Sequence, residues 1–175
     1  MCIRDRLSST KREDVTAGAT LSLDRSFRAP RKSVLAVSLL YGYVGVNSNQ
    51  NHYDARVTTF VGDFYGYDQQ SVGSQLRLGF GKNPSGPMIA EVGAAMSRRN
   101  YRSRVIQDAD GNYLSEKLNV TDTSVNLAFS YPLTKNFRTR LSSTFGRSTS
   151  NNDYEAVYRY NYSNANYQFG FTYEY

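Results

Sequence analysis

Cysteine is almost absent from this sequence. The only one, Cys2, lies within the first six residues, so residues 7–175 contain no thiol. This excludes a disulfide framework, a thiolate metal site and a cysteine nucleophile for that part of the chain. Long apolar runs are also absent: the mean hydropathy is -0.57, and no stretch approaches the length that a membrane-spanning helix needs. The sequence therefore excludes a helical membrane protein.

Histidine is limited to one residue, His52, in the segment NQNHYDAR. Asp54 could orient the imidazole of His52. However, no His-x-Ser pattern follows, and no other group of residues supports a catalytic site. Asp108, Asp110 and Asn112 are spaced like some calcium ligands, yet the further acidic residues of an EF-hand are absent, and Asp-Gly indicates a turn. We predict no enzyme activity, no cofactor and no metal site.

The first six residues, MCIRDR, reverse-translate to a sequence that matches the end of a transposase adapter used to prepare sequencing libraries. We interpret residues 1–6 as a library artefact and exclude them from the predicted fold, which covers residues 7–175. On this interpretation the chain starts inside a longer gene. A signal peptide and upstream strands would then precede it.

The composition favours strands and turns. Tyr 15, Phe 9 and Gly 13 accompany only four Pro and no Trp, a balance typical of β-structure. Apolar and polar residues alternate with period two in seven segments, at 15–23, 34–43, 72–80, 88–96, 124–131, 137–145 and 165–175. No segment has the spacing of an amphipathic helix, so the predicted class is all-β with antiparallel strands.

The connections between these segments alternate in length. Short turns are predicted at 27–33, 81–87 and 132–136, and long polar stretches at 47–70, 98–121 and 147–163. Short turns at one end and long loops at the other are typical of an outer-membrane up-and-down β-barrel. A soluble β-sandwich would show the same alternation, but its strands are typically about five or six residues long, whereas a tilted membrane-crossing strand needs about nine to eleven.

Charged residues within the strands fall on the polar face. The formal net charge is +6, but the basic residues form no stripe, so nucleic-acid binding is not predicted. Gln75, Arg77, Glu91, Arg138 and Arg140 are the predicted lumen-facing residues. In a wide barrel such groups line water and favour anions, whereas in a narrow one they pair and fill the lumen.

The chain ends NYQFGFTYEY, in which Tyr167, Phe169, Phe171, Tyr173 and Tyr175 alternate with small or polar residues. This pattern resembles the C-terminal signal by which the β-barrel assembly machinery recognises outer-membrane barrels, although family members usually end in Phe or Trp. The repeated hairpins and the YPLTKN turn resemble the C-terminal ends of large proteobacterial barrels, including porins and the barrel domains of surface lipoprotein assembly modifiers. The resemblance implies the outer membrane of a Gram-negative bacterium, with outer-membrane lipid and the assembly machinery as partners.

The strand number is left open by the sequence. If residues 53–64 form a surface loop, there are seven strands, and at least one more is needed because bacterial barrels have an even number. Tyr53, Val57 and Val61 lie on an alternating pattern, however, which would give eight. We favour an incomplete part of a larger transmembrane β-barrel, whose small-residue stripe at 88–96 is compatible with a homo-oligomer.

The predicted function is a porin-like passive diffusion channel. Three alternatives stay open: the barrel domain of a surface-protein export or assembly factor, a small OmpA-like structural barrel, and a soluble β-sandwich binding module. The first two share the membrane environment with a channel, and the third does not.

Overall fold

The computed structural model describes residues 13–30, 33–54, 58–81, 83–155 and 159–173. Residues 1–6 and Tyr175, on which two of the predictions depend, lie outside these ranges. None of the described residues belongs to a helix long and apolar enough to cross a membrane. The strands are β1 (Asp14–Ala29), β2 (Ser33–Ser48), β3 (His52–Asp54), β4 (Thr59–Val61), β5 (Tyr67–Phe80), β6 (Met88–Gln107), β7 (Tyr113–Pro132), β8 (Phe137–Ser150) and β9 (Tyr162–Tyr173).

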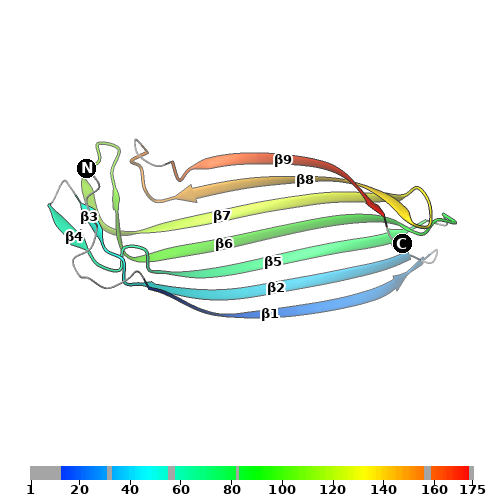
Figure 1. Cartoon of the computed structure of the whole chain (residues 1–175), viewed down its shortest axis with the longest axis horizontal. Helices are drawn as coiled ribbons and strands as arrows, with labels where there is room; N and C mark the ends of the chain where they lie inside the picture. The colour runs from blue at the N-terminus through cyan, green and yellow to red at the C-terminus, as the bar shows by residue number, and fades with distance from the viewer. Residues whose placement is uncertain (1–12, 31–32, 55–57, 82, 156–158, 174–175) are drawn as a thin grey trace.

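Seven of these strands form one antiparallel sheet in the order β1-β2-β5-β6-β7-β8-β9 (Figure 1). Each strand pairs with the next long strand along the chain, so the predicted all-β, up-and-down topology is confirmed. Among the described residues β1 pairs only with β2 and β9 only with β8. The sheet is therefore open, and it is not closed into a barrel.

The eight-strand alternative is wrong. β3 and β4 are three residues each and pair with one another in a separate two-stranded sheet. β2 instead pairs directly with β5, from Val34 opposite Gly79 to Val46 opposite Tyr67. The chain turns back at Thr58, whose φ is 51°, so the alternation around it belongs to a small hairpin beside the end of the sheet (Figure 1).

The register joins the apolar positions of the seven strands into one surface, which we call the apolar face. Leu76 lies opposite Val92, and Val92 lies opposite Leu127. This face is exposed: Leu21 is 71% accessible and Tyr167 70%. Its large side chains include Val15, Leu21, Leu23, Phe27, Leu39, Tyr41, Tyr43, Val72, Leu76, Leu78, Val92, Met96, Val125, Leu127, Phe129, Tyr131, Leu141, Phe145, Tyr167, Phe169, Phe171 and Tyr173.

Aromatic rings border the apolar face at both ends. Near the short turns lie Phe27, Phe80, Tyr131, Phe137 and Tyr173, and in the half of the sheet toward the longer connections lie Tyr41, Tyr43, Phe145 and Tyr167. Between these two rows the apolar stretch of most strands is about nine residues long, which matches a tilted strand that crosses a bilayer. Among the described residues between the two rows of rings, Arg25 is charged, and its guanidinium carbon is 5.5 Å from the Phe27 ring centre.

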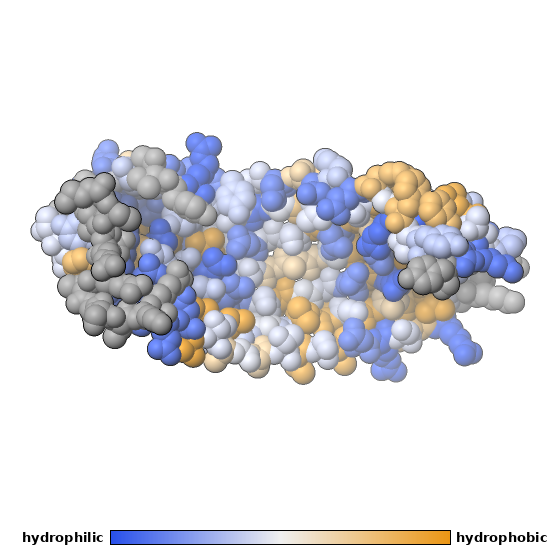
Figure 2. Space-filling view, in the orientation of Figure 1, coloured by the Kyte–Doolittle hydropathy of each residue, from blue (hydrophilic) through white to orange (hydrophobic). Residues whose placement is uncertain are grey.

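The opposite, polar face is the concave one. Along β7 the residues of this face, such as Leu118, Val120, Ala128 and Ser130, are buried, while those of the apolar face are exposed. In Figure 2 hydrophobic residues gather along the lower margin, over β1 and β2, and at the upper right, near the end of β9. The buried apolar cluster of the described residues is small and consists of Ile106, Leu118, Val120 and Tyr160.

The predicted long loop at 98–121 is largely strand. β6 continues to Gln107 and β7 begins at Tyr113, with register shifts between Asn100 and Gln107. The connection is a turn in which the Asp108 carboxylate accepts the Asn112 backbone N–H at 2.8 Å, and this bond lowers the pKa of Asp108. Gly111 has a φ of 80°, so the predicted Asp-Gly turn is confirmed. The strands were missed because this ribbon lacks an alternating apolar side.

Close contact between β1 and β2 makes Gly18 sensitive to substitution. A Cβ at Gly18 would lie 2.6 Å from the Tyr43 carbonyl oxygen, which belongs to the backbone and cannot rotate away. We expect Gly18→Ala to lower the free energy of unfolding by about 1–3 kcal/mol, as for other overpacked sites. Gly170→Ala is the matched control, because nothing lies within 4 Å of its Cβ position. Equal denaturant midpoints for the two variants would contradict the register between β1 and β2.

Candidate functional site

The predicted lumen-facing residues all lie on the concave face. Gln75 and Arg77 are on β5, Glu91 is on β6, and Arg138 and Arg140 are on β8. Three of them meet. Arg77 Nε is 3.3 Å from Glu91 Oε1, and Arg140 Nη2 donates to Glu91 Oε2 at 2.6 Å.

The other two predicted residues lie apart from this cluster. Gln75 is opposite Gly93 on β6 and opposite Ser38 on β2. Arg138 is near the short-turn end, where its Nη1 donates to the Pro87 carbonyl oxygen at 3.2 Å. The sequence placed all five on one face but gave no register, and so it could not distinguish the three that meet from these two.

Glu91 is a buried acid held between two half-exposed bases. Its side chain is 7% accessible, against 55% for Arg77 and 46% for Arg140. Burial of a carboxylate is costly unless it is paired and hydrogen-bonded, and here both oxygens have a guanidinium partner. The cluster carries one excess positive charge, and both arginines still reach solvent.

Arg140 reaches Glu91 across an intervening strand. β7 lies between β6 and β8, and its residues beside this contact, Ala128 and Ser130, are small and buried. Gly170, opposite Arg140 on β9, leaves open space on the other side. The Arg140–Glu91 ion pair therefore passes over small side chains, and it lies on the concave surface of the sheet.

A cavity of about 850 Å³ lies on the concave side where the longer connections meet. Its walls come from β3, β4, the far ends of β6 and β7, and the segment after β8. The Arg104 guanidinium lies over three rings, 4.7 Å from Phe64, 5.5 Å from Tyr101 and 5.2 Å from Tyr160. Sequence reasoning missed this cavity because its residues come from segments far apart in the chain.

His52 also lines this cavity, and its ring stacks on Phe64 with centroids 4.3 Å apart. The ring contact gives His52 a packing role between β3 and the segment after β4. Within the described ranges, no group of three or more His, Cys, Asp or Glu side chains lies close enough to hold a metal ion.

A polar clip ties three strands together beyond the apolar stretch of the outer face. Arg102 on β6 donates from Nε and Nη2 to the two oxygens of Asp68 on β5, at 2.9 and 2.8 Å. The Tyr43 hydroxyl on β2 donates to the same carboxylate at 2.8 Å, and Arg102 also donates to Asn47. The hydrogen bond from Arg102 is the largest cause that lowers the pKa of Asp68 to about 2.

The C-terminal aromatic residues lie on the outer face of the edge strand β9. Phe169 and Phe171 are in contact, with ring centroids 4.9 Å apart, and Phe171 stacks on Phe137 of β8 at 5.3 Å. Tyr167 and Tyr173 complete the row in the described part of the pattern. The alternation predicted from the sequence therefore places these four rings on one side of β9, the last strand of the described sheet.

No protein-family model matches this sequence, and comparisons with curated proteins and with solved structures found no match.

Removal of the shared acid should cost more stability than removal of one of its partners. Glu91→Gln leaves two guanidiniums without their common counter-charge, and we expect a loss of about 1–3 kcal/mol in the free energy of unfolding. Arg77→Gln leaves the shorter Arg140 contact intact and should cost less than about 1 kcal/mol. Chemical denaturation of both variants tests the order, and a larger loss for Arg77→Gln would contradict the shared role of Glu91.

The Asp68 clip should make stability depend on acid. The pKa of Asp68 is about 2 in the folded chain, below its usual 3.8, so its contribution is complete above about pH 5 and is lost as the pH falls toward about 2. Asp68→Asn removes this titration, and the thermal midpoint of the variant should fall less steeply over that interval. Because the clip is solvent-exposed, the difference will be small. Parallel pH profiles for the two proteins would contradict the assignment.

Proposed function

We propose that this chain forms part of the wall of an outer-membrane β-barrel that acts as a porin-like passive diffusion channel. The observation that carries the proposal is the exposed apolar face, which runs across all seven strands of a single-layer sheet. Soluble monomers rarely expose a contiguous apolar patch of more than a few hundred Å². In such a barrel the apolar face would contact lipid, and the polar concave face would contact water.

The soluble β-sandwich is the weaker alternative. A sandwich covers the apolar face of each sheet with a second sheet. In the described ranges the second sheet consists only of β3 and β4, with three residues each, at the end where the longer connections lie. The rows of aromatic rings at both borders of the apolar face also favour a bilayer, because such rings are enriched at its two interfaces.

Closure of the barrel requires further strands. β1 and β9 are the first and last of seven antiparallel strands, so they run in the same direction and would have to pair parallel. Bacterial barrels are antiparallel with an even strand number, and unpaired backbone groups in hydrocarbon are costly. We therefore propose a larger barrel in which an odd number of additional strands joins β9 to β1.

The concave face is suited to water and to anions. Arg77 and Arg140 share one carboxylate and remain half exposed, and Arg138 donates to the backbone carbonyl of Pro87 and forms no ion pair with a carboxylate of the described residues. Basic groups that line a water-filled lumen favour anions. The cavity around Arg104 lies at the end of the sheet where the longer connections meet. Its side chains would narrow the proposed water path there, as in a channel that limits the size of its solutes.

One observation favours a second candidate, a small structural barrel. The Arg77–Glu91–Arg140 contacts are the kind that interior residues make when they fill a narrow lumen. The row Tyr167, Phe169, Phe171 and Tyr173 is compatible with recognition by the β-barrel assembly machinery in either case.

Folding behaviour tests the membrane environment, and conductance tests the channel. The folded protein should require detergent or lipid and should migrate faster than the boiled protein in denaturing gels. In planar bilayers the protein should conduct with an anion preference that falls in Arg77→Gln and Arg140→Gln and rises in Glu91→Gln, since each change alters the charge beside the water path. Gly170→Ala is the uncharged control.

Each failure has a separate meaning. A protein that folds in lipid but neither conducts nor swells liposomes in small sugars would be a structural barrel. A protein that dissolves without detergent, with its tyrosines shielded from solvent quenchers, would overturn the membrane assignment.

A further inference from the structure

Two arginines on the outer face lie just beyond the apolar stretch, at the end where the longer connections lie. Arg98 is on β6 and Arg147 is on β8, and both are exposed. In the described part of the chain neither forms an ion pair with a carboxylate. Asp68, which lies opposite Asn100 of β6 and so near Arg98, is already bound by Arg102.

The register places the two arginines around one strand. Arg98 lies opposite Thr121 of β7, and Arg147 lies opposite Thr123 of the same strand. Two strand spacings and a shift of two residues put their Cα atoms roughly 12 Å apart. Both guanidinium groups can therefore reach a single ligand that lies over Thr121 and Thr123 of β7.

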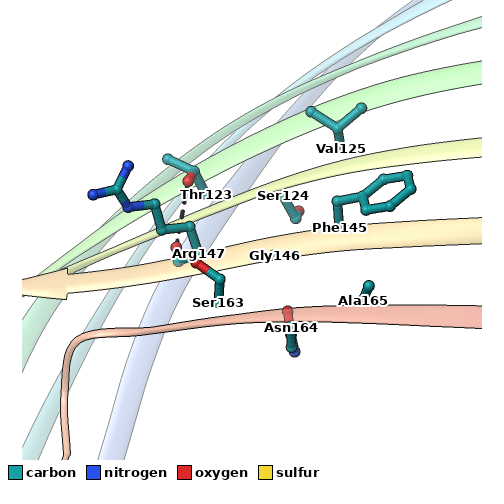
Figure 3. Close-up of a pocket in the computed structure, with 9 residues that line it drawn as sticks. All are labelled: Thr123, Ser124, Val125, Phe145, Gly146, Arg147, Ser163, Asn164 and Ala165. Atoms are coloured by element: carbon teal, nitrogen blue, oxygen red, sulfur yellow. Dashed lines mark hydrogen bonds between the residues drawn. The ribbon is translucent and has the colours of Figure 1, made fainter.

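A groove of about 500 Å³ opens beside Arg147, between β7, β8 and β9. Figure 3 shows Val125, Phe145 and Ala165 on the same side of the sheet as Arg147, whereas Ser124 and Asn164 point to the other side. Ala165 lies opposite Phe145, and its small side chain leaves space next to that ring. The groove thus joins an apolar slot to the Arg147 guanidinium, which pairs with no carboxylate of the described residues.

We propose that this groove binds the phosphate headgroup of a membrane lipid, with an acyl chain along Val125, Phe145 and Ala165. Guanidinium groups bind phosphate through two parallel hydrogen bonds, and a second arginine, Arg98, adds charge from the other side of β7. Ser163, opposite Arg147, offers a hydroxyl beside the same position. A free phosphate ion would contact the arginines but leave the apolar slot empty. A lipid would fill the slot with its acyl chain and bind the arginines with its phosphate.

The inference rests on the proposed membrane location, because only there does the apolar face meet lipid. It goes beyond the channel, since the groove is on the outer face and the proposed water path is on the concave face. At this level, next to the row of aromatic rings, lipid phosphates would lie beside Arg147. Bound lipid would link β7, β8 and the edge strand β9.

The test uses the full chain folded in a neutral detergent. Medium-chain phosphatidic acid is titrated into the micelles, and the thermal midpoint is followed by circular dichroism, with phosphatidylcholine of the same chain length as the neutral-headgroup comparison. Phosphatidic acid should raise the midpoint of the unmodified protein more than phosphatidylcholine does. The apparent affinity should fall about tenfold or more in Arg147→Gln and in Arg98→Gln, because each loses charge-assisted hydrogen bonds.

Three further arms fix the source of the phosphate and the place of binding. Arg28→Gln, an exposed arginine on the concave face opposite Val34, is the matched control and should bind as the unmodified protein does. Ala165→Phe should weaken phosphatidic acid by filling the slot, and inorganic phosphate should not compete.

Equal affinities in the unmodified protein, Arg147→Gln and Arg98→Gln would overturn the site. Competition by inorganic phosphate together with full binding by Ala165→Phe would overturn the lipid assignment. A chain that folds without detergent would already have overturned the membrane location before lipid is added, so the two failures are distinguishable.

Discussion

Everything in this structure depends on the match between the period of the strand and the register of the sheet. Side chains alternate between faces along each strand, and a shift of one residue would exchange the two faces of that strand. In seven consecutive strands the register keeps the apolar residues on one side. Since the described sheet has no second layer over this side, its apolar surface must find a partner outside these residues.

The polar side is stabilised differently. Its buried positions are occupied by a shared carboxylate, small residues and a limited apolar cluster around Leu118. Electrostatic contacts such as Arg77–Glu91–Arg140 bury the acid but keep both arginines in fixed places where they still reach solvent. The same face can therefore be rigid and still carry charge along a water path, which is what the proposed channel needs.

The sequence predicted the parts of the fold that hydrophobic alternation encodes. The seven strands, their order and the common face of Leu21, Val72 and Phe169 follow from period two and from the turn residues. The strand residues beyond 98 were missed because the apolar residues of that ribbon, such as Ile106 and Leu118, are few and do not alternate regularly along it. The cavity around Arg104 and the pairing of Arg140 with Glu91 depend on contacts between distant segments, and such contacts leave no local pattern. Arg25 lies between apolar residues of the outer face, whereas the charged residues Arg77, Glu91, Arg138 and Arg140 of the predicted strands lie on the concave face.

The reach of Arg140 across β7 to Glu91 has a mechanical consequence. A contact between two strands that flank a third acts as a chord across an arch, so its length limits how far the arch can flatten. Ala128 and Ser130 lie on β7, beneath the contact between Arg140 and Glu91. A bulkier residue at either position would lift the Arg140–Glu91 ion pair away from β7 and make the sheet flatter. We therefore expect the curvature of this sheet to depend in part on the small size of Ala128 and Ser130.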